Sequence, residues 1–345
     1  MKTHRLLLIL FTLACAGHSS AAAPAGSSLA FETSDFTKAT LYKGGPGFGL
    51  SMAPSGAFGM NATWETTHSG KWFIEYQRVC AEAIGAGLAL GNEAAVERGL
   101  KMTEWGFAHM ETDGSFKCDD AYHSASFFIE AAAYALLLLE ASPMHEKWKP
   151  RIEALKPPLG KAAHWMAKPS VAVPVWNGVQ KQFAHRWFAC AAALGQSGVL
   201  LNDRELLAKA KSLLHDGIRA QLPNGVNPEK GGYDSVYQAA GLLYATHYYA
   251  NVADTADRSP LKRSIDKGLA WLVSRISSDG IINMQGNTRT AGQEVGRSGN
   301  VKGAETKFAV RALGFWATLA GNASYQALAE KVSAAPQGST DHPNP

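Results

Sequence analysis

Apolar residues recur every three or four positions along most of this chain, and this helical period limits the possible fold more than any other feature. Strict alternation of apolar and polar residues, which would indicate β-strands, is scarce. The pattern therefore predicts an all-α protein. The expected helices cover residues 72–90, 93–110, 124–140, 148–167, 181–200, 203–221, 235–251, 261–276, 305–320 and 324–334.

The expected helices come in pairs, with short turns such as Gly91-Asn92 within a pair and longer polar loops between pairs. Three of the longer loops share an Asp-Gly or Asn-Gly step, at Asp113-Gly114, Asn224-Gly225 and Asp279-Gly280, so their glycines are 111 and 55 residues apart. Such loops should recur at the shorter interval, and residues 168–177 lie where the missing one is expected. A repeated helix pair predicts an (α/α) toroid or barrel of about five to seven antiparallel pairs. An open α-solenoid is the alternative.

The N-terminus has the pattern of a secretory signal peptide, predicted over residues 1–23. Basic residues at Lys2 and Arg5 precede an apolar run over 6–16 and a zone of small residues over 19–23. We expect a periplasmic or secreted protein with a flexible tether over 24–35, one toroid domain over 36–335 and a disordered tail over 336–345. No other segment is expected to span a membrane.

Charge and cysteine content exclude several functional classes. The chain has 33 basic and 29 acidic residues, and removal of the signal peptide leaves 31 basic ones without a basic run, which argues against nucleic-acid binding. A local basic cleft can still hold an anionic polymer. Cys80, Cys118 and Cys190 allow one disulfide and one thiol, or three buried thiols, and their spacing predicts no metal site. No cofactor is expected, and the protein is predicted to be a monomer.

In a toroid every inner helix begins on the same rim, so residues at those starts should converge although they lie far apart in the sequence. The first turn of a helix also favours anions. The residues expected on this rim are Trp64, His68, Trp72, Tyr76, Asp119, Asp120, Tyr122, His123, Asn177, Gln182, His185, Arg186, Tyr233, Asp234, Tyr237, Gln238, Asn287, Arg289, Glu294 and Glu305.

The junction at residues 224–238 joins a loop of Asn-Gly, Asn-Pro and Gly-Gly steps to the start of a helix. Tyr233 and Tyr237, four residues apart, are expected on one side of the helix end, with Asp234, Ser235 and Gln238 as capping groups.

Tyr, His, Asn and Arg side chains without a metal motif suit β-elimination of a polyuronate. The uronate carboxylate must be neutralised, a base must remove the C5 proton, and an acid must protonate the departing O4. Tyr237 is the predicted acid, or the group for both proton transfers, with a pKa lowered by nearby cations. His185 is the partner base or neutraliser, Asn177 the carboxamide neutraliser and Arg289 a carboxylate clamp.

The chain resembles the toroid-fold polysaccharide lyases that act on uronates, the alginate-lyase group and especially polysaccharide lyase family 38. The resemblance is carried by residues 231–238 (GGYDSVYQ), by Asn177 with His185-Arg186, and by residues 287–290 (NTRT). It implies Tyr237 as proton donor, with His185 and either His123 or Asn177 around the carboxylate. The Asn-Asn-His-Ser-Tyr-Trp signature of alginate lyases is absent, which leaves glucuronan or another β-1,4-linked polyuronate open beside alginate. The expected substrate-binding residues are Arg186, Tyr233, Gln238, Asn287, Arg289, Lys230, Trp72 and Tyr76.

Two other functions fit the same residues. A glycoside hydrolase on the same fold would use Asp119 or Asp120 with Asp234 as its two carboxylates. A non-catalytic periplasmic glycan-binding protein would need none of these groups for chemistry.

Overall fold

The computed structural model describes residues 26–297 and 299–336, and within them it confirms an all-α protein without β-strands. Each of the ten predicted segments is a helix, the first one preceded by a 3-10 turn over Ile74–Val79. These helices are α4 (Cys80–Leu90), α5 (Glu93–Ala108), α6 (Ala121–Ala141), α7 (His145–Ala167), α9 (Ala184–Leu201), α10 (Arg204–Ala220), α11 (Ser235–Asn251), α12 (Thr255–Ser274), α14 (Thr306–Ala320) and α15 (Ala323–Ala334). The sequence pattern did not reveal α3 (Met60–Thr67) or α13 (Thr288–Ala291).

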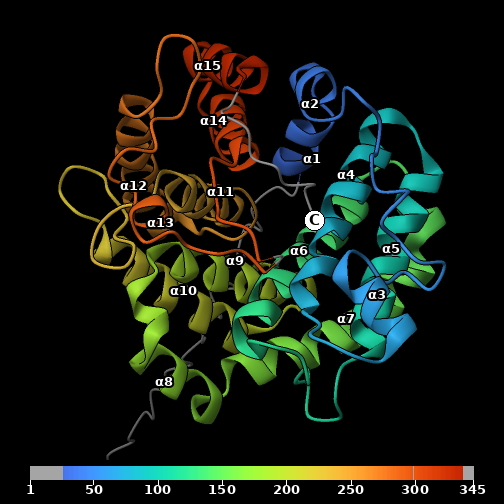
Figure 1. Cartoon of the computed structure of the whole chain (residues 1–345). Helices are drawn as coiled ribbons and strands as arrows, with labels where there is room; N and C mark the ends of the chain where they lie inside the picture. Colours follow the sequence, from blue (N-terminus) through green and yellow to red (C-terminus); the bar gives the residue numbers. More distant parts are fainter. Residues whose placement is uncertain (1–25, 298, 337–345) are drawn as a thin grey trace, which may run out of the picture.

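Consecutive helices pack as pairs, namely α4 with α5, α6 with α7, α9 with α10, α11 with α12 and α14 with α15. The first members α4, α6, α9 and α11 contact one another in chain order, and α14 follows against α11. The second members lie outside them (Figure 1). Composition follows this division: α6 is buried along almost its whole length, whereas α10 buries one face.

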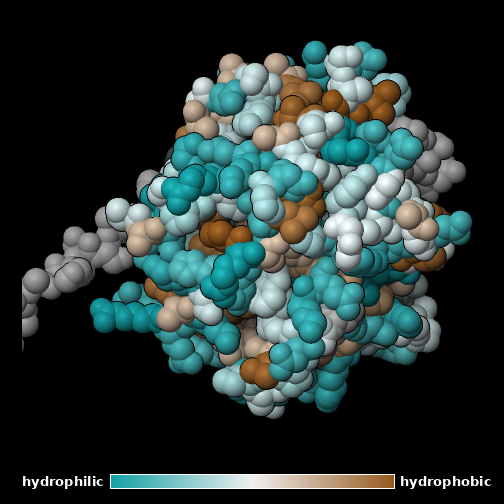
Figure 2. All heavy atoms as spheres, turned by 90° about the vertical axis from the view of Figure 1, so that its left-hand side faces the viewer, coloured by the Kyte–Doolittle hydropathy of each residue, from teal (hydrophilic) through white to brown (hydrophobic). Residues whose placement is uncertain are grey.

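Helix α6 is long and apolar enough to cross a membrane by length and composition, so the expectation that no segment beyond the signal region has the length and apolarity of a membrane span is wrong. Most of α6 is buried inside the protein, which is typical of a core helix. The face in Figure 2 is largely hydrophilic, with small, separated apolar patches.

In three of the five pairs, α4/α5, α9/α10 and α14/α15, a left-handed residue ends the first helix and an Asn or Asp side chain caps the second, which keeps the connection short. Gly91 and Asn202 end α4 and α9 with φ of 63° and 52°. The side chains of Asn92 and Asp203 then accept backbone N–H groups at the starts of α5 and α10.

The repeated glycine loops have a common structural reason. Gly114 and Gly225 have φ of 94° and 92°, and a Cβ there would lie 2.4 and 2.2 Å from the carbonyl oxygens of Lys161 and Lys267. Each loop thus docks on the outer helix of the following pair, where only glycine fits. Gly280 and also Gly56, which sequence reasoning missed, make the same contact with Lys331 and Lys101.

The loop expected over residues 168–177 is wrong, because this stretch is helix α8 (Pro169–Asn177). Pro169 lies in its first turn, where a proline needs no N–H and its fixed φ suits a helix.

The tether expected over residues 24–35 is wrong from Gly26 onward. Residues Gly26–Glu32 form α1 and Asp35–Thr40 form α2. Phe31 is fully buried and stacks on Phe315 with ring centroids 4.4 Å apart, and α1 contacts α4, α6, α11 and α14. The predicted signal peptide and the part of the predicted tail beyond Pro336 lie outside the described residues.

The three described cysteines are free thiols, with Cys80 and Cys190 buried and Cys118 partly buried. Burial raises the pKa of Cys118 to about 11. The structure thus favours thiols over the disulfide alternative.

Candidate functional site

The first turns of three neighbouring inner helices bring together several of the predicted rim residues. His123 lies in the first turn of α6, His185 and Arg186 in that of α9, and Tyr237 in that of α11. The rings of His185 and Tyr237 stack with centroids 4.4 Å apart and planes 8° apart. Arg186 lies with Nη2 3.3 Å from His123 Nε2. The expected convergence is confirmed for these four residues.

His185 is oriented by a residue that sequence reasoning missed. The Oε1 atom of Glu229 accepts the backbone N–H of His185 at 2.9 Å and lies 2.9 Å from its Nδ1. Because Oε1 already acts as an acceptor, we assign the ring proton to Nδ1, which leaves the lone pair on Nε2. Both residues are buried, and burial lowers the pKa of His185 well below its usual value and raises that of Glu229. His185 is therefore neutral, with Nε2 able to accept a proton.

Tyr237 lies between an anion and a cation. Its hydroxyl donates to Glu294 Oε1 at 2.6 Å and accepts from Lys302 Nζ at 2.8 Å. Arg289 lies over the ring, with its guanidinium carbon 4.5 Å from the centroid. Burial raises the pKa of Tyr237, since it outweighs the opposing charge of Arg289, and Glu294 adds to the rise. The expectation of a lowered pKa is thus wrong, and Tyr237 carries its proton at neutral pH.

Glu294 is held by two lysines as well as by Tyr237. Lys302 Nζ is 2.7 Å from Oε1, and Lys230 forms an ion pair with Oε2. Partial burial alone would raise the pKa of Glu294, but the hydrogen bonds from Lys230, Lys302 and Tyr237 hold it at about 2. Lys302 gave no sequence signal, since it lies in a Gly-rich loop without apolar periodicity. Glu229 directly precedes the singled-out Lys230, and its place in the loop that begins at Asn224 could have suggested it.

His123 and Arg186 form the third part of the site. Burial lowers the pKa of His123 well below its usual value, and the positive charge of Arg186 lowers it further. Arg186 lies over the Phe183 ring at 4.0 Å and bonds to Gln180. Burial also lowers the pKa of Arg186.

Four predicted substrate contacts or rim groups are structural instead. Arg289 is 1% exposed and donates to Asp234 Oδ2 at 2.9 Å, so it is no open carboxylate clamp. Asp234 uses its other oxygen to cap α11 through Val236 and Tyr237. Gln238 and Asn287 are fully buried. The Gln238 side chain accepts the backbone N–H of Asn227, and the Asn287 side chain accepts the hydroxyl of Ser235.

Tyr233 and Tyr237 do not share a helix face, because α11 begins only at Ser235. The Tyr233 hydroxyl donates to the carbonyl of Gln285, away from Tyr237. Tyr76 is largely buried, and its hydroxyl contacts the sulfur of Met60.

Asn177 is exposed at the C-terminal end of α8 and not at a helix start. Among the described residues it forms no contact with His185 or Tyr237. The expectation that it neutralises the carboxylate beside these two residues lacks structural support.

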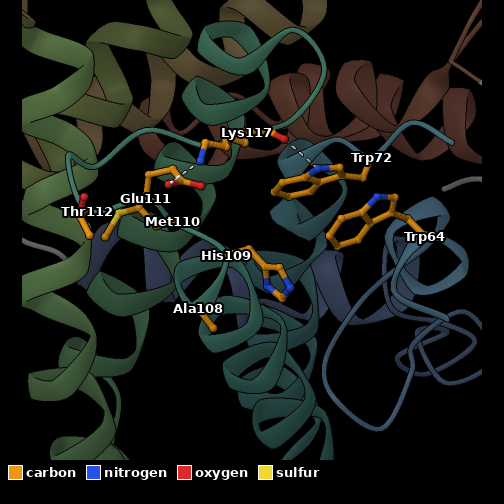
Figure 3. A pocket seen from close by; sticks show the side chains of 8 residues that line it. All are labelled: Trp64, Trp72, Ala108, His109, Met110, Glu111, Thr112 and Lys117. Atoms are coloured by element: carbon orange, nitrogen blue, oxygen red, sulfur yellow. Dashed lines mark hydrogen bonds and ion pairs between the residues drawn. The ribbon is translucent and has the colours of Figure 1, made fainter. Parts of the chain in front are cut away.

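Trp72 lines a separate pocket of about 320 Å³ (Figure 3). Its ring stacks on Trp64 at 5.0 Å, and its indole N–H donates to the carbonyl of Lys117. His109 and Lys117 also face this pocket (Figure 3). The Nζ atom of Lys117 lies 3.2 Å from the carboxylate of Glu111, which also lines this pocket, so the lysine is already paired.

Within residues 26–297 and 299–336, no group of three or more His, Cys, Asp and Glu side chains is arranged to hold a metal ion. Comparison with known proteins finds no matching family model, no similar curated protein and no similar solved structure.

Proposed function

We propose that the protein is a secreted or periplasmic lyase that cleaves a β-1,4-linked polyuronate, such as glucuronan or polymannuronate, by β-elimination. The observation that carries the proposal is the stacked pair of His185 and Tyr237. One member is a neutral imidazole with a free Nε2, and the other is a protonated phenol. A base and an acid thus lie side by side, as elimination requires.

In this proposal His185 Nε2 removes the C5 proton, and the Tyr237 hydroxyl protonates O4 as the C4–O4 bond breaks. The electron pair of the C5–H bond forms the C4–C5 double bond of the product. Glu229 keeps the imidazole in the required tautomer. Arg186 and the two lysines near Tyr237 supply positive charge for the carboxylate and for the charge that develops next to C5.

We further propose that the five helix pairs close into an (α/α) toroid with this site on its rim. The inner helices contact one another in order from α4 to α14. Helix α1 contacts both α4 and α14, and so bridges the first and last pairs. The loop after α13 also joins the two ends, because Arg297 pairs with Glu75 at 2.5 Å and with Asp120 at 3.2 Å.

The hydrolase alternative is less well supported. Asp234 is fully buried and both of its oxygens are used, one in the helix cap and one by Arg289. Asp120 pairs with Arg297. Two free carboxylates that flank a glycosidic bond, as hydrolysis requires, are therefore missing from the predicted set.

The test is a panel of glucuronan, polymannuronate, polyguluronate and a neutral glucan, incubated with the purified mature protein. We expect ultraviolet absorbance from the unsaturated uronate with at least one polyuronate and none with the glucan. New reducing ends without this absorbance would establish hydrolysis instead. No reaction with any polyuronate would leave glycan binding as the better account.

A further inference from the structure

The carboxylate of Glu294 is bound as a ligand carboxylate would be. Tyr237 donates to its Oε1 at 2.6 Å, Lys302 contacts the same oxygen at 2.7 Å, and Lys230 contacts Oε2. Three donors from two loops and one helix thus converge on one carboxylate. Charged donors around both oxygens are how proteins recognise carboxylates.

We propose that this cluster is the binding site for the carboxylate of the reacting uronate, and that Glu294 occupies it in the free protein. The inference rests on the proposed lyase function, and it names the groups that recognise the substrate. In this arrangement Glu294 is an internal competitor that the substrate displaces.

The charge of the cluster permits such an exchange. Lys230 and Lys302 carry two positive charges against one negative charge on Glu294. If the substrate carboxylate replaces that of Glu294, the balance at the lysines stays the same. Glu294 is ionised at neutral pH both inside the cluster, which lowers its pKa, and outside it, where a glutamate has its ordinary pKa. It is therefore released as an anion, and no proton has to be taken up or lost.

The cluster is also accessible. The side chains of Lys230, Lys302 and Glu294 are 34, 26 and 16% exposed. Arg289, by contrast, is 1% exposed and committed to Asp234, so it cannot take this role. A sugar carboxylate can therefore reach the lysines from solvent.

The position of the cluster fits the chemistry. A carboxylate bound in place of Glu294 would lie within a hydrogen bond of the Tyr237 hydroxyl. The Tyr237 ring stacks on His185. The carboxyl group, C5 and O4 of one uronate lie within a few bonds of one another, so neutralisation and both proton transfers can occur on one bound residue.

The test is calorimetric titration of the mature protein with D-glucuronate, which has no chain on O4 to cleave, and with D-glucose as the neutral probe. We expect Glu294→Gln to bind glucuronate roughly tenfold more tightly than the wild type, because an uncharged amide competes for the two lysines less well than a carboxylate does. Adding Lys302→Met should abolish this gain. Glu330→Gln, an exposed change of the same charge, should leave affinity unchanged, and glucose should not distinguish any of the proteins.

Equal or weaker glucuronate binding by Glu294→Gln would overturn the inference. If that variant fails to fold, Glu294→Asp replaces it, because its side chain is one methylene shorter and its carboxylate cannot keep every contact. A smaller gain in glucuronate affinity supports the inference, and no gain overturns it. Failure of the lyase proposal is a separate result. Tighter binding without unsaturated product from polyuronates refutes the lyase alone, and product without tighter binding refutes the displaced carboxylate alone.

Discussion

Glu229 gives the sharpest prediction about the site, because it acts only through His185. Its Oε1 accepts two N–H groups of His185, one from the backbone and one from the ring. The Glu229 side chain is fully buried. Glu229→Ala removes this acceptor, whereas Glu229→Gln retains an oxygen of the same shape. The pair separates the acceptor from the carboxyl group.

The magnitude follows from the two stranded donors. Each buried donor left without a partner costs about 1–3 kcal/mol, so Glu229→Ala should lower the free energy of unfolding by about 2–6 kcal/mol. Glu229→Gln leaves its amide nitrogen where Oε2 now lies buried without a partner, and should cost only about 1–3 kcal/mol. Both losses are smaller than the stability of many domains of ordinary size.

The effect on turnover should differ more. Without Glu229 the imidazole loses its tautomer and orientation, and we expect kcat to fall roughly 100-fold, within the range that a general base supplies. Glu229→Gln should stay within roughly tenfold of the wild type, because its oxygen still accepts the Nδ1 proton. The assay is initial rate on a cleaved polyuronate, with chemical denaturation alongside. Equal rates for the two folded variants would refute the proposed role of Oε1.

Three further predictions concern other parts of the molecule. Tyr237→Phe keeps the ring stacked on His185 but removes the proton donor, so kcat should fall at least roughly 100-fold, while circular dichroism shows an intact fold. A near-normal rate would exclude Tyr237 as the acid. Burial depresses the pKa of His123 in the folded state, so protons favour the unfolded state. Stability should fall as pH drops below about 6.5, by up to about 1.4 kcal/mol per pH unit more than in His123→Gln, and parallel pH curves in thermal unfolding would contradict this. Glu32→Ala leaves the buried Arg311 without the carboxylate that lies 2.8 Å away, and should lower the free energy of unfolding in denaturant by about 3–5 kcal/mol. The control Asp35→Ala changes an exposed residue and should cost under about 0.5 kcal/mol. Equal effects of the two changes would show that α1 adds nothing to the core.

The sequence predicted the helices well because their signal is local. The apolar period lies within each helical segment, and capping residues such as Asn92 and Asp203 lie directly beside it in the sequence. The short N-terminal helices were missed, since α1 is too short for a period and is held by partners such as Phe315 that lie far along the chain. The spacing of the repeat alone predicts a loop over residues 168–177, whereas the local sequence forms helix α8 there.

The site was predicted only where position along an inner helix decides it. His123, His185 and Tyr237 could be found because the starts of neighbouring helices converge. Whether a polar group faces the site or serves the fold depends on contacts over long sequence separations, such as Arg289 with Asp234. Lys302 and Glu229 were missed for the same reason. The expected direction of the Tyr237 pKa shift was wrong because burial, which the sequence pattern does not reveal at this position, outweighs the neighbouring cations.

The central claim is that the carboxyl group at C5 makes the polymer reactive. It is tested most directly with one polyuronate that the protein cleaves and the same polymer after its carboxyl groups are reduced to alcohols. We predict that the protein releases unsaturated product from the polyuronate and leaves the reduced polymer intact, because only the acid form has a C5 proton that the site can make acidic. Cleavage of both polymers at similar rates, with new reducing ends and no ultraviolet absorbance, would contradict the account.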